Sequence, residues 1–121
     1  MTIEQCYQIL GGSYEEVSLR LPSLRLVEKF IAKFLTDTSF DTLCAQMDSG
    51  NREEAFRAAH TLKGVCANLG FGRLLRSVDR LTEILRPEGD GIPQEAHALM
   101  DTVREDYRVT VDAIRGYLEQ H

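Results

Sequence analysis

The apolar residues of this chain recur at intervals of three and four along most of its length, and this periodicity constrains the fold more than any other feature. A helix turns by about 100° per residue, so this spacing gathers side chains on one helical face. No segment shows the strict alternation of apolar and polar residues that is typical of a strand. The clearest example is a stripe in the middle of the chain, made of Ala55, Ala59, Leu62, Cys66 and Leu69. The sequence therefore predicts an all-α protein.

Capping residues, glycines and prolines divide the chain into successive helices. Residues 2–10 are predicted to form a short helix that ends at Gly11, and Ser13 begins a second short helix that stops at Pro22. Longer helices then begin at cap residues or at a proline, with a kink between the first two. Their predicted ranges are 23–36, 38–50, 51–69, 74–86 and 93–118.

The short connections between these helices require antiparallel neighbours. We therefore predict an antiparallel up-and-down four-helix bundle over residues 23–121, with short cover helices in residues 1–22. A chain of 121 residues with 43% hydrophobic content can bury one core but lacks the length for two. The prediction is a single domain spanning residues 1–121.

Composition and charge exclude several classes of function. The formal net charge of −5 argues against a nucleic-acid partner, which would need a basic surface. No apolar run approaches the roughly 20 residues of a membrane span, and the N-terminus lacks a targeting pattern, so we expect a cytoplasmic protein that does not bind membranes. Three widely spaced cysteines favour neither a disulfide framework nor a zinc site. Cys44 and Cys66 are predicted to be buried, which leaves Cys6 as the candidate reactive thiol.

The helix predicted over residues 51–69 carries a polar group of residues away from its apolar stripe. Rotation along the helix places His60 about 140° from the centre of that stripe, with Gly64 nearly opposite it and Lys63 on the flank. The imidazole is therefore expected to be exposed beside a cation and beside a residue with no side chain. Glycine inside a helix costs about 1 kcal/mol relative to alanine. Access of a partner to His60 is the simplest compensation for that cost.

The residues around this histidine resemble the signature of the histidine-containing phosphotransfer (HPt) domain, H-x-L-K-G-x-x-x-x-L-G. The matching positions are His60, Leu62, Lys63, Gly64, Leu69 and Gly70. The resemblance implies a phosphorelay intermediate without kinase activity of its own. In this role His60 accepts a phosphoryl group from the aspartyl phosphate of a receiver domain and passes it to another receiver aspartate.

Elementary chemistry is consistent with these roles. A neutral imidazole is a competent nucleophile near pH 7. Lys63 can supply positive charge to the phosphoryl oxygens. The sequence offers no carboxylate cluster beside His60, so we expect no cofactor in this chain and a magnesium ion in the receiver. The expected partners are receiver domains of response regulators or hybrid histidine kinases, bound by a monomer.

Further site residues follow from the expected pairing of helices. If the turn lies near residues 70–71, His60 is level with Thr82, whose hydroxyl could orient the imidazole directly or through water. HPt domains often have a glutamine at the matching place, so threonine is a departure. A partner surface is predicted at Phe56, Arg57, Ala67, Asn68 and Arg86, with Phe56 partly buried. A mildly basic patch for an acidic receiver is predicted from Arg52, Arg57, Lys63, Arg73, Arg76, Arg80 and Arg86.

Two other functions remain open from the sequence. The chain could be an interaction module that occupies a receiver or a kinase without being phosphorylated. It could also be a phosphoacceptor domain that a separate histidine kinase phosphorylates directly. His97 and His121 are predicted to be ordinary surface residues, because neither has metal-ligand spacing with His60.

Overall fold

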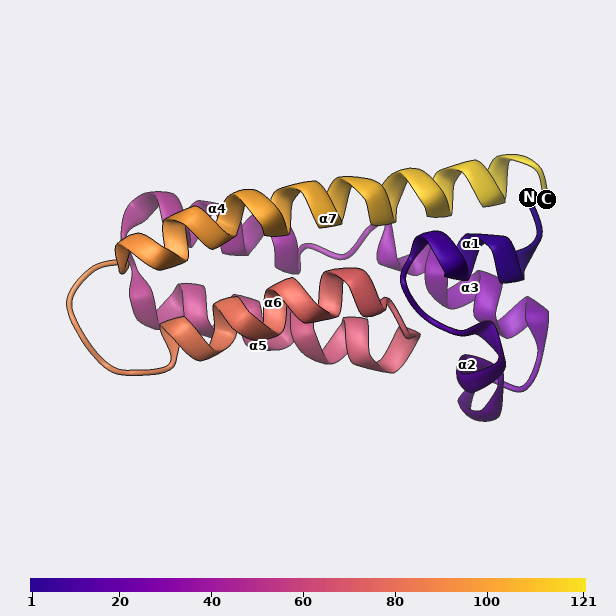
Figure 1. Ribbon diagram of the computed structural model, residues 1–121, viewed down its shortest axis with the longest axis horizontal. Helices are drawn as coiled ribbons and strands as arrows, with labels where there is room; N and C mark the ends of the chain where they lie inside the picture. Colours follow the sequence, from indigo (N-terminus) through magenta and orange to yellow (C-terminus); the bar gives the residue numbers. More distant parts are fainter.

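The computed structural model describes all 121 residues and contains seven α-helices and no strand. The all-helical prediction is confirmed, and most predicted helix boundaries agree with the structure within a few residues. The helices, drawn in Figure 1, are α1 (Ile3–Ile9), α2 (Tyr14–Arg20), α3 (Leu24–Phe34), α4 (Ser39–Ser49), α5 (Arg52–Leu69), α6 (Gly72–Leu85) and α7 (Gln94–Glu119).

The ends of α5 form as the sequence predicts. The Asn51 side chain accepts a hydrogen bond of 3.1 Å from the backbone amide of Glu54, which satisfies one of the free amides at the start of the helix. At the other end Gly70 adopts a left-handed conformation with φ of 74°, where a side chain would be strained. The helix that carries His60 therefore has fixed limits on both sides.

The predicted kink before α4 is a complete break between two helices. Thr38 was the predicted cap of α4, but its side chain makes no capping hydrogen bond. Instead the Asp37 carboxylate accepts a hydrogen bond of 2.8 Å from the backbone amide of Ser39. Thr38 therefore stands at the predicted cap position, but the first free amide of α4 is satisfied by the carboxylate one residue earlier.

The longer helices form the predicted four-helix bundle. Helix α5 packs against α4 on one side and α6 on the other, and α6 packs against α7. Figure 1 shows α7 running along the whole bundle, with α3 and α4 following one another on its far side, so these two share one position in the bundle. No helix combines the length and apolar composition that crossing a bilayer requires.

The N-terminal helices lie at one end of the bundle, where both chain termini meet (Figure 1). They contribute to the core as well as covering it, because Tyr7 and Leu10 are fully buried in the same apolar cluster as the bundle. The Tyr7 hydroxyl donates a hydrogen bond of 2.8 Å to the Leu69 carbonyl at the end of α5. A Cβ atom on Gly12 would overlap the carbonyl oxygen of Gly70. The N-terminal segment therefore packs directly onto the turn between α5 and α6.

Cys6 lies within this N-terminal contact and is fully buried. Its thiol donates a long hydrogen bond of 3.6 Å to the Ala113 carbonyl on α7, and burial raises the pKa of the thiol to about 11. The prediction that Cys6 could be reactive is wrong, because α1 packs this face against α7.

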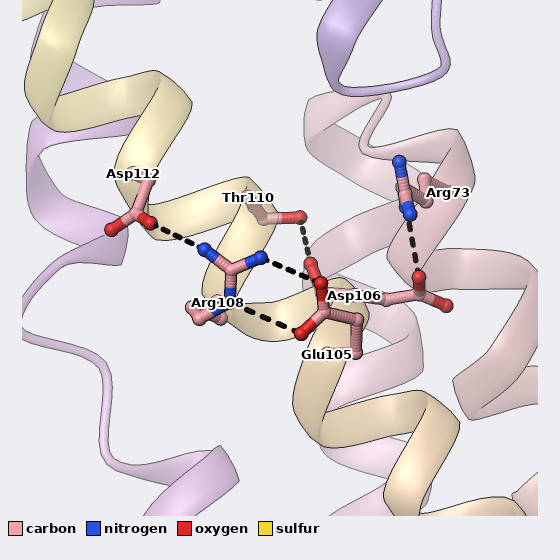
Figure 2. Close-up of polar contacts among 6 residues, drawn as sticks. All are labelled: Arg73, Glu105, Asp106, Arg108, Thr110 and Asp112. Atoms are coloured by element: carbon pink, nitrogen blue, oxygen red, sulfur yellow. Dashed lines mark hydrogen bonds and ion pairs between the residues drawn. The ribbon is translucent and has the colours of Figure 1, made fainter.

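A charge pair joins the first turn of α6 to the middle of α7 (Figure 2). Arg73 Nε lies 2.8 Å from Asp106 Oδ1, and the Asp106 side chain is only 12% exposed. The Thr110 hydroxyl donates to the backbone carbonyl of Asp106, and on the outer face Arg108 bridges Glu105 and Asp112. Of these contacts, the Arg73–Asp106 pair joins the two helices and helps to fix the register of α6 against α7.

Candidate functional site

The outer face of α5 carries His60, and the structure leaves this side chain exposed. All five members of the predicted apolar stripe are buried in the bundle. Because the stripe fixes the rotation of the helix, the histidine must face away from the core. The imidazole is therefore open to a second protein.

Two short rows of side chains face each other along the exposed edge between α5 and α6. In each row the members are separated by four and then three residues, which is the spacing of one helical face. The row on α5 is Phe56, His60 and Lys63, and the row on α6 is Asp79, Glu83 and Arg86.

Two contacts fix how the rows are paired. The Arg86 guanidinium lies over the Phe56 ring, 5.1 Å from its centroid. One turn to the other side of His60, Lys63 Nζ lies 2.8 Å from Asp79 Oδ1. Since the two helices are antiparallel, these contacts place Glu83 level with His60.

The imidazole of His60 stacks on the Phe56 ring, with the ring centroids 5.9 Å apart and the planes inclined by 21°. Phe56 is partly buried, as predicted, and packs against the core of the bundle while its ring also stacks with His60. Aromatic stacking of this kind restricts the orientation of a side chain that is otherwise free in solvent. Phe56 thus supports the histidine from the N-terminal side.

Gly64 provides open space on the opposite side of His60. A Cβ atom built on this glycine would have no atom within 4 Å, so the glycine does not serve close helix packing. Farther along the same face Ala67 and Asn68 are exposed, and their backbone carbonyls accept hydrogen bonds of 3.4 and 3.0 Å from Arg20 of α2. On this side of His60 the surface of α5 therefore carries little side-chain bulk at Gly64 and Ala67, and α2 lies at its far end.

The predicted basic patch is partly neutralised in the structure. Four of its seven members form ion pairs with carboxylates: Arg57 with Glu53 and Glu54, Lys63 with Asp79, Arg73 with Asp106 and Arg86 with Glu83. Arg52 instead donates to the carbonyls of Ile84 and Leu85 at the end of α6. Arg76 and Arg80 form no ion pair, so acidic residues one turn away or on the neighbouring helix reduce the positive charge of the predicted patch without removing it.

Thr82 does not orient His60. The residue is fully buried, and its hydroxyl donates a hydrogen bond of 2.7 Å to the Val78 carbonyl within α6. Thr82 lies at the predicted level along α6, but its side chain faces the core and not His60. The next residue, Glu83, lies at nearly the same level on the exposed side.

Glu83 and Asp79 are the residues at this site that the sequence analysis missed. Two hydrogen bonds from Arg86, of 3.0 and 3.2 Å, hold the pKa of the Glu83 carboxyl below its usual range. Lys63 lowers this pKa further, while the charge of Asp79 raises it. The repeated spacing of four and three on both helices was the signal that could have found them.

A shallow cavity of about 560 Å³ opens beside Phe56, where α6 ends and α5 begins. Its walls combine arginine side chains with the apolar Phe56 and Leu85 and with the loop after α6. The lining residues are Arg52, Glu53, Phe56, Arg57, Leu85, Arg86, Pro87, Glu88 and Gly89. No group of three or more histidine, cysteine, aspartate or glutamate side chains is arranged to hold a metal ion.

Comparison with known proteins agrees with this geometry. The Hpt domain family matches residues 25–120, which include nearly all of α3 and every residue of the two rows. Searches of curated proteins and of solved structures give no match. Because the family match covers most of the chain, this protein belongs to the Hpt domain family.

Proposed function

We propose that this protein is a phosphorelay intermediate whose phosphoacceptor is His60. Hpt domains are phosphocarrier modules and not kinases, so membership of the family implies a phosphotransfer role in a phosphorelay. The observation that carries the assignment to His60 is its position on the exposed face of α5, with empty space over Gly64 on one side and a stacked Phe56 on the other.

The chemical step is an exchange of one phosphorus bond for another. A lone pair on one ring nitrogen of His60 attacks the phosphorus of a receiver aspartyl phosphate, the N–P bond forms, the P–O bond breaks, and the aspartate leaves as a carboxylate. The second ring nitrogen keeps its proton, so the product ring gains positive charge. The Glu83 carboxylate, level with His60, is suited to stabilise that charge.

Lys63 supplies positive charge on the other side of the transferred group. It lies three residues after His60 and therefore on the same helical face. A compact ammonium can approach phosphoryl oxygens as they gain charge during transfer. The magnesium ion expected for this chemistry would neutralise the phosphoryl group from the receiver side.

Docking of the receiver is proposed on the predicted partner residues around His60. Arg57, Ala67, Asn68 and Arg86 are exposed, and Phe56 is partly so. The cavity beside Phe56 can accept an apolar side chain of the partner, and exposed arginines at its rim can form polar contacts. The small residues Gly64 and Ala67 allow the partner backbone to approach the imidazole.

The test is transfer from phosphorylated receiver domains to the parent protein and to two variants. We expect His60→Gln to fold like the parent but to accept no phosphate, because an exposed histidine contributes little packing and glutamine has no nucleophilic nitrogen. The matched control is His97→Gln, which removes another exposed histidine, on α7, and should transfer like the parent.

Each outcome separates the proposed function from its alternatives. Acid-labile phosphate retained by His60→Gln at the parent's level would contradict the assignment. Labelling by a histidine kinase and ATP without any receiver would favour direct phosphorylation by a kinase. Tight binding to a receiver with no transfer in either direction would favour an interaction module.

A further inference from the structure

The Lys63 ammonium, one turn from His60, forms an ion pair with a carboxylate on the neighbouring helix. Its Nζ atom lies 2.8 Å from Asp79 Oδ1, and the two side chains are 31% and 46% exposed. Building on the proposed function, we propose that Asp79 is a positioning residue that competes with phosphorylated His60 for this ammonium. It thereby limits how far phosphate accumulates on this protein.

The geometry makes the competition unavoidable. Lys63 is on the same face of α5 as His60, one turn away, and Asp79 approaches from α6 on the side away from Phe56. A phosphoryl group on His60 would bring further negative charge to one side of the ammonium while Asp79 remains on the other. A lysine ammonium on a flexible stem can reorient between two anions of this kind.

The other cation of the two rows is less able to change partner. Arg86 forms two hydrogen bonds to Glu83 and also lies over Phe56, so moving it would break three contacts. Lys63 has one ion pair, formed through a single ammonium group. Lys63 is therefore the cation that responds to phosphorylation, and Asp79 is the group that it must leave.

Removing the charge of Asp79 should favour the phosphorylated state of His60. Exposed ion pairs contribute modestly, so Asp79→Asn is expected to shift the transfer equilibrium toward phosphohistidine by about two- to fivefold. Part of this shift comes from the freed ammonium and part from the loss of a nearby negative charge. Receiver affinity should change little, because Asp79 is not among the residues proposed to dock the receiver.

The experiment measures the equilibrium distribution of phosphate between one receiver and the parent, Asp79→Asn or Asp79→Glu. Asp79→Glu keeps the charge and should stay close to the parent. Asp101→Asn is the matched control, since it also removes one carboxylate from an exposed ion pair, but on α7 with Arg104. The same Asp79→Asn change in a Lys63→Gln background should shift the equilibrium much less. Receiver binding and urea unfolding of each variant exclude effects on docking or folding.

The outcomes distinguish this inference from the proposed function. If the parent accepts phosphate on His60 but Asp79→Asn leaves the equilibrium unchanged, the competition is refuted while the phosphotransfer role stands. An equal shift with and without Lys63 would also refute it, since Asp79 would then act without the lysine. If the parent accepts no phosphate at all, both the inference and the proposed function fail.

Discussion

At the scale of single residues, Gly64 shows most directly how function shapes this sequence. Nothing in the fold occupies the space where its side chain would be, so the glycine lowers helix stability without a packing benefit. Partner access to His60 is the compensation that the geometry supports. A small and a large side chain at position 64 should therefore have different effects on phosphotransfer.

Gly64→Ala should raise the free energy of unfolding by about 1 kcal/mol and leave phosphotransfer nearly unchanged, because one methyl group adds helix propensity but little bulk. Gly64→Gln should also be at least as stable as the parent, yet it should slow transfer strongly by covering the approach to His60. Urea unfolding and single-turnover transfer rates check both variants. Parent-like transfer by Gly64→Gln would show that access is not the purpose of the glycine.

Lys63 allows charge in the chemical step to be separated from attraction of the receiver. Lys63→Ala should slow transfer within the bound complex, and Lys63→Arg should recover only part of the rate, because a planar guanidinium places its donors differently. The measurement is the single-turnover rate at saturating receiver. If the bound-complex rates of parent and Lys63→Ala are equal, the lysine has no chemical role. Weaker association of the variant with the receiver, with high salt abolishing association for parent and variant alike, would then show that Lys63 attracts the receiver electrostatically.

The three cysteines should differ in reactivity according to burial. Burial raises the pKa of Cys6 to about 11 and that of Cys66 to about 12, so both remain protonated and shielded at about pH 8. Cys44 is partly exposed, and burial also raises its pKa. Alkylation of the folded protein followed by mass spectrometry should modify Cys44 first. Modification of Cys6 at the same rate would mean that α1 does not stay packed on α7.

The direction in which side chains point was predicted better for α5 than for α6. A single helix with a clear apolar stripe fixes its own rotation, which is why the exposure of His60 and Gly64 could be predicted. Thr82 was misplaced because a turn position gives the level of a residue on the next helix but not its direction. Asp79 was missed for a related reason, since a cross-helix ion pair depends on the rotation of both helices.

At the scale of helices, contacts at the turn between α5 and α6 fix how these two helices are aligned. The N-terminal segment packs on that turn through Tyr7 and Gly12, and Arg73 joins the start of α6 to Asp106 on α7. These contacts lie at the far end of α5 from Phe56, so they determine how the two rows align without touching the phosphoacceptor.

Tyr7→Phe tests this stabilisation. The change removes a buried hydrogen bond to the Leu69 carbonyl and should lower the free energy of unfolding by about 1–2 kcal/mol. Transfer to His60 should be unaffected in the fraction that is folded. Tyr14→Phe is the control, because Tyr14 is only partly buried and its hydroxyl makes no hydrogen bond within the chain. Equal destabilisation by the two changes, measured by urea unfolding, would contradict the role given to the Tyr7 hydroxyl.

At the scale of the whole molecule, the bundle and the order of its helices were predictable because each helix has its own stripe and clear ends. The charge distribution was not predictable in the same way. Arg57, Lys63 and Arg86, the cations of the predicted patch that lie nearest His60, are each paired with carboxylates, so the positive charge there is lower than the sequence alone indicates. Docking should therefore depend on local contacts near Phe56 more than on long-range attraction.

The bundle presents three histidines to solvent, and we propose that its architecture makes one of them, His60, the phosphoacceptor. The most direct measurement is transfer from a phosphorylated receiver domain to the purified protein, followed by mapping of the acid-labile phosphate with mass spectrometry. All three histidines are exposed, so the labelling pattern reports which one the receiver can reach. We expect a single phosphohistidine at His60, with His97 and His121 unmodified. Phosphate distributed over all three histidines, or absent from His60, would contradict it.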